Sequence, residues 1–279
     1  MLPSAPARKI VGRHHPLIKR IRAMVHSGDL LDDGEILLET PHLIEDAIQS
    51  GVAINTLLVR SDAAAPVWEL LHRVSGGTKQ YSIEPKRFAE LTSTENNPGI
   101  IALAKASAWK EENMFSGRRT LLLVLAGIQD PGNLGTILRA AEAFGVTGVL
   151  ATKGTVSPFN SKAIRAASGT LFRLPVLTNF SPRKIVSLLR RENVVLLAST
   201  PRGGASLAGI NVSKPVALAL GSEGAGLPRE LEEAGRRVSL PMAPRVESLN
   251  VATAAAVMLY EIARQRQSAS PTADAEEIG

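Results

Sequence analysis

The chain has 279 residues, 44% of them hydrophobic and 21% charged, which is normal for a globular protein and long enough for two domains. The absence of cysteine excludes disulfides and thiolate metal sites, and no apolar run is long enough for a membrane span or a signal-peptide core. We therefore expect a soluble, cytoplasmic protein. Its net charge of +6 favours a polyanionic partner.

Basic side chains crowd the N-terminal segment, with no acidic residue among them: Arg8, Lys9, Arg13, Lys19, Arg20 and Arg22. Such a cluster suits contacts to nucleic-acid phosphates, although a solvated basic tail has the same composition. Aromatic residues make up only 4% of the chain, so stacking on exposed bases cannot be the main mode of binding. We expect phosphate contacts and shape to carry any affinity for nucleic acid.

Residues 1–106 alternate between short helical and short extended patterns. Helices are expected at 16–26, 41–50, 66–74 and 85–91, and strands at 35–38, 56–59, 81–83 and 99–104. This alternation predicts a small α/β domain. A polar stretch without periodicity, 107–118, is predicted to be a linker, and the small, polar and acidic residues 267–279 are predicted to form a disordered tail.

Residues 119–266 alternate between apolar runs and helical patterns at a longer spacing. The expected strands are 121–125, 149–151, 174–176, 194–198, 216–220 and 238–240. The expected helices are 134–144, 161–168, 182–190, 228–234 and 249–266. Alternation of this kind predicts a parallel sheet that is covered by helices on both faces.

Two loops of the second domain suggest a ligand pocket at the edge of this sheet. A glycine-rich loop, 221–226, follows the strand at 216–220, and a second loop, 242–247, leads to Ser248 and Asn250, either of which can cap the last helix. Ligands of open α/β sheets bind beyond the carboxyl ends of the strands. Each loop alone is also compatible with an ordinary strand-to-helix turn.

A third loop, GIQDPGNLGTILR at 127–139, follows the first strand of the second domain. Asn133 stands where a helix cap belongs, so it is either that cap or a site residue, and Arg139 is the strong cation expected beside the pocket. The second domain contains neither histidine nor cysteine, which excludes a serine–histidine triad and a histidine–metal cluster there. The loop GSEGAG lacks the dinucleotide-binding GxGxxG pattern, and no phosphate-binding GxxxxGK[ST] motif occurs.

Three ordered motifs now carry a resemblance: QDPGNLGTILRAAEAFGV at 129–146, ALALGSEGAGLP at 217–228 and LPMAPRVESLNVATAAAVMLYE at 240–261. With SPFNSKAIRAASGTLFRLPV at 157–176, they make the second domain resemble the SpoU (TrmH-like) branch of the SPOUT superfamily, the RNA ribose 2′-O-methyltransferases. The first domain resembles the substrate-binding domain common in this branch, which is related to the ribosomal L30e fold. In its segment LLETPHLIEDAI, Thr40-Pro41 replaces the glycine usual in the family.

The resemblance implies an α/β fold whose C-terminal domain has a parallel sheet and a deep trefoil knot, a homodimer, no metal, and S-adenosylmethionine as the cofactor. Carried over by position, the cofactor contacts are Thr200, Gly221, Leu240, Met242, Ser248, Leu249 and Asn250. The implied catalytic set is Asn133, Arg139, Glu223, Ser248 and Asn250. RNA contacts are expected from the basic N-terminal cluster and from Lys162 and Arg165.

The expected reaction is methyl transfer to a ribose 2′-hydroxyl of RNA, with 23S-type ribosomal RNA favoured and tRNA as the alternative. A catalytically silent RNA-binding dimer is the competing hypothesis. Because arginine has a pKa above about 12, we favour Arg139 as an electrostatic partner of the developing alkoxide or a nearby phosphate, while its use as a base in this family stays open. Asn133 is expected to position Arg139 or the ribose, and Glu223 to orient its neighbours.

Overall fold

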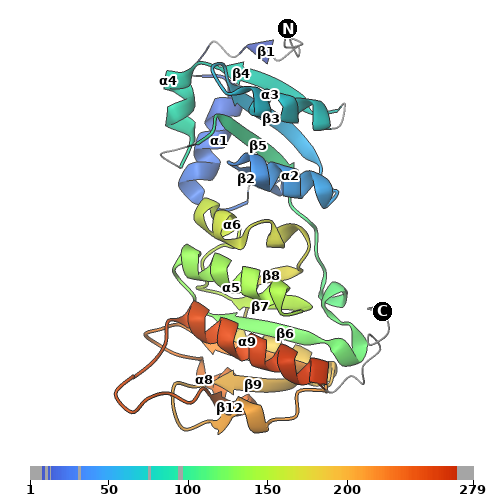
Figure 1. Cartoon of the computed structure of the whole chain (residues 1–279), viewed down its shortest axis with the longest axis vertical. Helices are drawn as coiled ribbons and strands as arrows, with labels where there is room; N and C mark the ends of the chain where they lie inside the picture. Colours follow the sequence, from blue (N-terminus) through green and yellow to red (C-terminus); the bar gives the residue numbers. More distant parts are fainter. Residues whose placement is uncertain are drawn as a thin grey trace, which may run out of the picture. The chain divides into compact units, whose positions relative to one another are not determined.

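The computed structural model of the chain describes residues 8–9, 12, 14–30, 33–74, 77–93 and 97–268 (Figure 1). The chain divides into two compact units, residues 1–108 with 157–173, and residues 109–156 with 174–279. Among the described residues, no helix is both long and apolar enough to cross a membrane. The predicted tail lies outside these residues from 269 onward, and residues 267–268 end the last helix.

The first unit is built on a mixed sheet with the strand order β1-β4-β3-β5-β2. Strand β5 pairs antiparallel with β3 and β2, whereas β4 pairs parallel with β3 and β1. The strands are β1 (Arg8–Lys9), β2 (Glu35–Leu38), β3 (Ile54–Arg60), β4 (Lys79–Ile83) and β5 (Ile100–Lys105). The helices are α1 (Pro16–Ser27), α2 (Pro41–Gln49), α3 (Ala65–Leu70), α4 (Pro85–Phe88) and α6 (Ser161–Ala167), with short 3-10 turns at 71–73, 89–91 and 170–172.

Helix α2 shows why the sequence departs from the family pattern without loss of structure. The Thr40 hydroxyl accepts a hydrogen bond from the Leu43 amide at 3.3 Å, and Pro41 occupies the first helical position. A threonine cap followed by proline is a favoured way to begin a helix. The threonine hydroxyl accepts from one of the free amides of the first turn, and proline has no amide hydrogen that needs a partner. The Thr40-Pro41 pair is therefore compatible with the expected domain.

The second unit contains a parallel sheet with the strand order β10-β12-β9-β11-β6-β7-β8, in which every neighbouring pair is parallel. The strands are β6 (Leu121–Ala126), β7 (Gly148–Thr152), β8 (Val176–Phe180), β9 (Val195–Ser199), β10 (Ala205–Ser206), β11 (Val216–Gly221) and β12 (Arg236–Ser239). The helices are α5 (Pro131–Ala143), α7 (Pro182–Arg191), α8 (Arg229–Ala234) and α9 (Val251–Ser268), with short 3-10 turns at 111–114, 117–119 and 207–209. The predicted parallel α/β architecture is confirmed.

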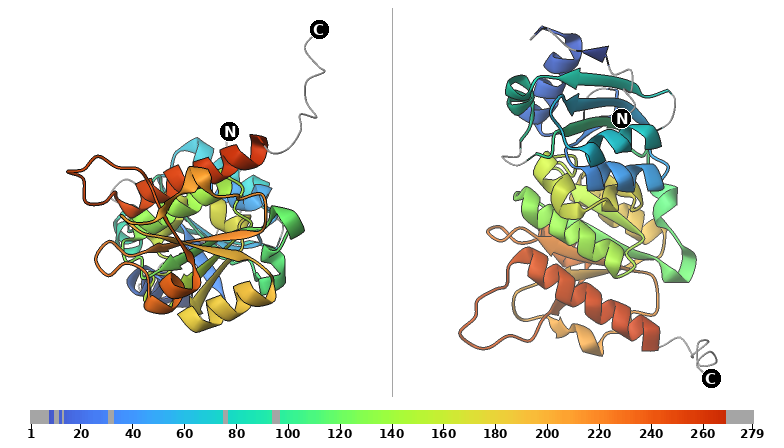
Figure 2. Two further views of the ribbon diagram at one scale, coloured as in Figure 1. Left: turned by 90° about the horizontal axis from the view of Figure 1, so that it is seen from below. Right: turned by 45° about the horizontal axis from the view of Figure 1, so that its top comes forward.

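Helices cover both faces of this sheet. Helix α9 packs against α5 and β11, while α7 packs against α8 and β9. Viewed along the sheet, α9 and α7 lie on opposite sides of the strands (Figure 2). The central strand β6 is buried at all six positions because both of its faces are covered, which explains its wholly apolar sequence LLLVLA.

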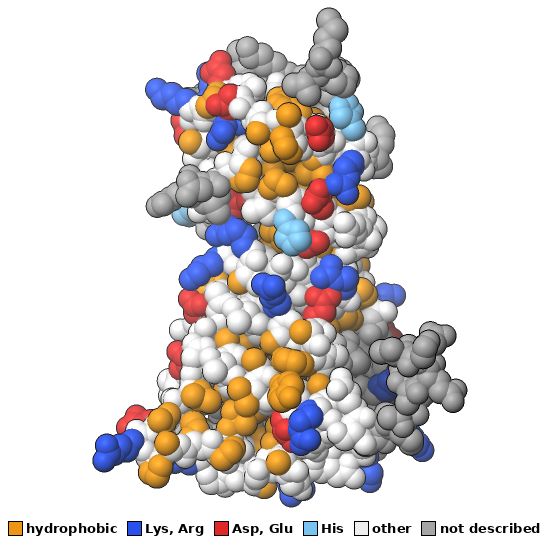
Figure 3. All heavy atoms as spheres, in the orientation of Figure 1, with side chains coloured by type: hydrophobic (Ala, Val, Ile, Leu, Met, Phe, Trp, Pro, Cys, Tyr) orange, Lys and Arg blue, Asp and Glu red, His pale blue; other side chains and the backbone are white. Residues whose placement is uncertain are grey.

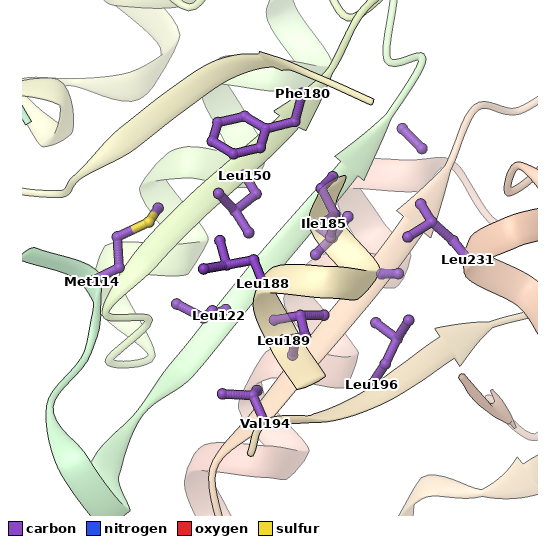
Figure 4. Close-up of a cluster of buried hydrophobic side chains, with 14 residues drawn as sticks. Met114, Leu122, Leu150, Phe180, Ile185, Leu188, Leu189, Val194, Leu196 and Leu231 are labelled. Carbon is purple, nitrogen blue, oxygen red and sulfur yellow. The ribbon is translucent and has the colours of Figure 1, made fainter. Parts of the chain in front are cut away.

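The core under α7 includes a residue from the predicted linker. Met114 is fully buried in a cluster with Leu122, Leu150 and Leu188 (Figure 4). Gly148 makes room for it, since a Cβ there would stand 2.7 Å from the Met114 side chain. Residues 109–118 therefore pack with the second unit instead of forming a free connection, because the apolar Met114 gains more from burial than from exposure.

Three further details differ from the sequence-based expectation. A strand was expected at 174–176, whereas strand β8 begins only at Val176. Pro175, just before it, has no amide hydrogen and contributes only its carbonyl, which accepts from Val149 N at 2.8 Å. The two-residue strand β10 was not expected. Residues 157–173, which contain α6, pack with the first unit, for example through Ser157, whose hydroxyl donates to Asp29 at 2.6 Å.

Candidate active site

A pocket opens at the carboxyl ends of three neighbouring strands, β9, β11 and β12. It encloses about 650 Å³ of empty space, part of which is continuous with solvent. Six of the seven residues expected to contact the cofactor line it: Thr200, Gly221, Leu240, Met242, Ser248 and Leu249. The seventh, Asn250, is not among the lining residues, but Val251 beside it is. The pocket expected at this edge of the sheet is confirmed.

Gly221 is required by the path of its own loop. A Cβ at this position would collide with the backbone of Gly226 and Leu227, so the glycine lets the loop fold back on itself. The return is closed by a hydrogen bond of 3.0 Å from the Gly226 amide to the Ser222 carbonyl, and Gly226 has a positive φ of 67°. The glycines therefore shape the pocket wall itself.

A second pocket lies next to the first and shares part of its wall. On one side it is lined by Gly127, Ile128, Gln129, Asp130 and Asn133, and on the other by residues 222–225 and Val251. Ser222, Glu223 and Val251 line both pockets. Side chains at this shared wall can therefore contact two bound molecules at once.

The shared wall carries a polar cluster formed by Glu223, Asn133 and Asn250. Glu223 Oε1 accepts hydrogen bonds from Asn133 Nδ2 at 3.2 Å and from Asn250 Nδ2 at 3.1 Å. Asn250 Nδ2 also donates to Asn133 Oδ1 at 3.1 Å, and the Val251 amide reaches Glu223 Oε1 at 3.5 Å. Three of the five predicted catalytic residues thus come together from three separate segments of the chain: the first turn of α5, the loop after β11 and the residue before α9.

Capping leaves Asn133 free for this cluster. Asp130, and not Asn133, caps α5, because its carboxylate accepts from the Asn133 amide at 2.7 Å. Asn250 caps α9 through its Oδ1, which accepts from Ala252 N at 2.9 Å, so of the two candidate caps the structure selects Asn250 over Ser248. The expectation that Asn133 stands at the cap position was wrong by three residues.

Arg139 and Ser248 lie apart from the polar cluster. Ser248 lines the first pocket, whereas Arg139 is exposed on α5 and lines neither pocket of its own chain. Six residues separate Arg139 from Asn133, which corresponds to roughly 9 Å along the axis of a helix. The expectation that Arg139 stands beside the pocket is therefore not met within one chain.

The predicted RNA-contacting cations fall into different environments. Arg20 pairs with Asp33 and with Glu35, the latter at 2.7 Å, Arg22 pairs with Glu90, and Arg165 pairs with Glu39 at 2.8 Å. The Arg20 guanidinium lowers the pKa of the Asp33 carboxyl. Lys19 and Lys162 are exposed, and Arg13 and the side chains of Arg8 and Lys9 lie outside the described residues.

A metal-binding cluster is absent from the described part of the chain. Within the described ranges, no group of three or more His, Asp or Glu side chains is arranged to hold a metal ion.

Sequence reasoning missed Arg202, whose guanidinium donates to the carbonyls of Pro244 at 2.9 Å and Val246 at 3.0 Å. Both carbonyls belong to the loop that forms one wall of the first pocket. No motif marks Arg202, and only the folded structure brings these segments together.

Comparison with known proteins agrees with this geometry. The model of the SpoU rRNA methylase family matches residues 120–260, and that of an MRM3-like substrate-binding domain matches residues 15–102. An uncharacterised tRNA/rRNA methyltransferase of Synechocystis sp. is 34% identical over 94% of this chain and 95% of its own length. The Bacillus subtilis 23S rRNA (guanosine(2553)-2′-O)-methyltransferase RlmP is 34% identical over 81% of this chain and 87% of its own.

Solved structures extend the comparison over both units. The SpoU methyltransferase AviRb of Streptomyces viridochromogenes, in complex with AdoMet, superposes with a TM-score of 0.80 at 27% identity, covering 88% of this chain and 98% of AviRb. An AdoMet-bound rRNA methyltransferase of Sinorhizobium meliloti gives 0.77 at 28% identity, with 92% and 98% covered. Motifs, pocket and comparisons lead to one conclusion: the chain belongs to the SpoU rRNA methylase family.

Proposed function

We propose that the protein transfers a methyl group from S-adenosylmethionine to a ribose 2′-hydroxyl of ribosomal RNA. The observation that carries this proposal is the cluster of Glu223, Asn133 and Asn250 at the wall shared by two pockets. A group-transfer enzyme needs a donor site and an acceptor site in contact, with polar groups at their boundary. RlmP, a relative over most of the chain, carries the name of a 23S rRNA 2′-O-methyltransferase.

The first pocket fits the cofactor. Its walls combine apolar side chains, such as Leu227, Leu240 and Met258, with the more polar segments 199–201 and 221–223. Such a mixture suits an adenosine, whose base has apolar faces and polar edges. Thr200, Gly221, Leu240, Met242, Ser248 and Leu249 are the proposed contacts, with Asn250 supporting them from the shared wall. When bound, S-adenosylmethionine supplies an electrophilic methyl group. The proposal includes the trefoil knot that the family resemblance implies.

The second pocket is the proposed site of the target nucleotide. An aliphatic hydroxyl is a poor nucleophile, so its proton must be drawn away as it reacts. Glu223 Oε1 accepts three hydrogen bonds, which fixes the carboxylate, whereas no hydrogen bond to Oε2 is resolved in the described part of the chain. We infer that Oε2 accepts a hydrogen bond from the 2′-hydroxyl, and that Asn133 and Asn250 hold the carboxylate in place.

A homodimer would bring Arg139 into the reaction. Apolar side chains gather over α5 and α9, where Val257 is 44% and Tyr260 55% exposed and Phe144 meets Tyr260 with ring centroids 5.9 Å apart (Figure 3). Arg139 is four residues from Ala143 on α5, and both are exposed. In a dimer formed through this face, Arg139 of one protomer would lie beside the pockets of the other. There the guanidinium stabilises the developing alkoxide or an adjacent phosphate.

Recognition of the RNA is assigned to the first unit. The match of residues 15–102 to a substrate-binding domain supports this role, as do the exposed Lys19 and Lys162 and the basic residues before them. Ribosomal RNA is favoured because both the family model and RlmP carry that description, and tRNA is the alternative. We propose that the protein acts in the cytoplasm, where precursor RNA is available.

The decisive test is transfer of labelled methyl from S-adenosylmethionine to unmodified rRNA and, separately, to tRNA, followed by digestion to nucleosides. We expect a labelled 2′-O-methyl nucleoside from the rRNA pool. Label in the tRNA pool alone would support the proposed reaction but contradict ribosomal RNA as the substrate. If neither pool is labelled and the cofactor does not bind, the competing description as a silent RNA-binding dimer holds instead.

A further inference from the structure

Arg202 connects two walls of the first pocket. It lies in the loop after β9, two residues beyond Thr200, whose hydroxyl donates to the Arg202 carbonyl at 3.0 Å. Its Nη2 donates to the carbonyls of Pro244 at 2.9 Å and Val246 at 3.0 Å, in the loop that supplies Met242, Ser248 and Leu249 to the pocket. One guanidinium nitrogen therefore joins the loop after β9 to residues 241–250, which lead from β12 to the catalytic cap Asn250.

Asn250 is held by its hydrogen bonds to Asn133 and Glu223, but the preceding residues, 241–249, have little besides Arg202 to hold their shape. All of them except Met242 are exposed, so burial of apolar side chains does not fix the loop. The resolved hydrogen bond inside it runs from Val246 N to Ala243 O at 3.0 Å. An exposed loop with so few contacts samples many conformations unless a specific tether orders it.

We propose that Arg202 is a positioning residue that clamps residues 241–250 in the cofactor-binding shape. The loop supplies Met242, Ser248 and Leu249 to the pocket and ends at Asn250, so a disordered loop binds the cofactor only in the fraction of molecules where it is correctly folded. The clamp lowers this ordering cost before the cofactor arrives. This inference rests on the proposed function for the identity of the cofactor, but not for the existence of the clamp.

Arginine suits this task better than lysine. Its guanidinium is planar and always charged, and one of its nitrogens, Nη2, donates to both carbonyls. A lysine ammonium is a compact, strongly hydrated charge on a flexible stem. The Arg202→Lys variant therefore keeps the charge and loses part of the geometry.

The experiment compares wild type with Arg202→Ala and Arg202→Lys in the full-length protein. Trypsin cleavage after Arg245, an exposed residue inside the loop, is followed by mass spectrometry without cofactor. Binding of S-adenosylmethionine is measured by calorimetry. For Arg202→Ala we expect both the cleavage rate and the Kd to rise about tenfold, equivalent to about 1.4 kcal/mol, with Arg202→Lys in between. Turnover at saturating cofactor should change less than the Kd does, because ordering precedes the reaction.

Arg183→Ala is the matched control. Arg183 is an exposed arginine on α7 that pairs with Glu230 at 3.7 Å, and α7 lies across the sheet from α9. Its removal should leave both the cleavage after Arg245 and the Kd unchanged. Wild-type cleavage and Kd in Arg202→Ala would overturn the clamp. Should wild type itself fail to bind S-adenosylmethionine, the proposed function fails, and the cleavage rates alone still decide whether Arg202 holds the loop.

Discussion

Two glutamates in this protein each accept several hydrogen bonds, yet they differ in burial and in whether a cation is among their partners. Glu223, at the shared wall of the pockets, is exposed and accepts from two asparagine side chains and one backbone amide. Glu39, in the first unit, is 1% exposed and accepts from Thr92 Oγ1 at 2.9 Å, Ser93 N at 2.7 Å, Ser93 Oγ at 2.6 Å and Arg165 Nη1 at 2.8 Å. Several hydrogen bonds to one carboxylate thus occur both in a buried and in a solvent-exposed setting.

Burial decides what each network does. A carboxylate without water depends on its partners, so removing one of them leaves an uncompensated charge and destabilises the fold. A carboxylate in contact with water loses little when a partner is removed, because water replaces it. The Glu39 network therefore stabilises the first unit and attaches residues 157–173 to it, whereas the Glu223 network is available to a ligand. Hydrogen-bond counts alone do not distinguish these roles.

The largest effect is expected from breaking the buried network. Glu39→Ala leaves the Arg165 guanidinium and the donors of Thr92 and Ser93 without their acceptor, so the free energy of unfolding should fall by about 3–5 kcal/mol. Arg165→Ala should approach the same loss, since it leaves Glu39 buried without its cation. Urea unfolding followed by circular dichroism measures both. A loss in Arg165→Ala of RNA affinity without a loss of stability would instead support its predicted role as an RNA contact.

Glu223→Gln tests the exposed counterpart. The amide keeps the shape of the side chain but removes the charge that draws the 2′-proton, so turnover should fall about 10²- to 10³-fold. Unfolding should change by less than about 0.5 kcal/mol, as for other exposed positions. Single-turnover methyl transfer and urea unfolding of the same preparation give the two values. A Glu223→Gln protein with normal turnover and reduced stability would reverse the roles assigned to the two networks.

Arg139→Ala probes a cation that neither network contains. We expect a fall in turnover of about 10²-fold, with S-adenosylmethionine affinity little changed, because the guanidinium stabilises charge that develops during the reaction. If Arg139 acts in the partner's site, mixing Arg139→Ala with Glu223→Gln protomers should restore activity, since about half of the dimers then hold one complete site. Mixed samples as inactive as the separate variants would contradict action across the interface.

The features that sequence alone predicted are those carried by local patterns. Apolar runs such as Leu121–Ala126 mark strands that are buried on both faces, and the loops around Gly221 and Asn250 follow directly from where those strands end. Even the local prediction of a helix cap failed at Asn133, since Asp130 and Asn133 are both good caps and only the folded loop selects the earlier one. Where two nearby residues can both cap a helix, the sequence alone does not show which of them does.

Contacts between distant segments could not be predicted from patterns. The sequence gives no sign of the pairing between Arg165 and Glu39, which lies 126 positions earlier in the chain. Arg202 and Val246 are 44 residues apart and share no motif. Met114 is a lone apolar residue in a polar stretch, and its burial depends on the space above Gly148. Each of these pairings depends on how the folded segments pack against one another, which no local spacing records.

The smallest effect is expected at a third carboxylate, Glu261 on α9, which also accepts several hydrogen bonds but is only half-buried and lies outside both pockets. Hydrogen bonds from Arg264, and then from Gln265, lower its pKa from 4.5 to about 2. Because the folded pKa is depressed, the stabilisation is fully present above about pH 4.5 and is lost as the pH falls through about 2.

Glu261→Gln should therefore lower the free energy of unfolding only slightly near neutral pH, and its difference from wild type should shrink as the pH falls from 4.5 toward 2. Urea unfolding of both proteins at a series of pH values measures this difference. Turnover should be unaffected at neutral pH, because Glu261 lines neither pocket. A loss as large as that of Glu39→Ala would mean that hydrogen-bond number, and not burial, sets the energetic weight of a carboxylate in this protein.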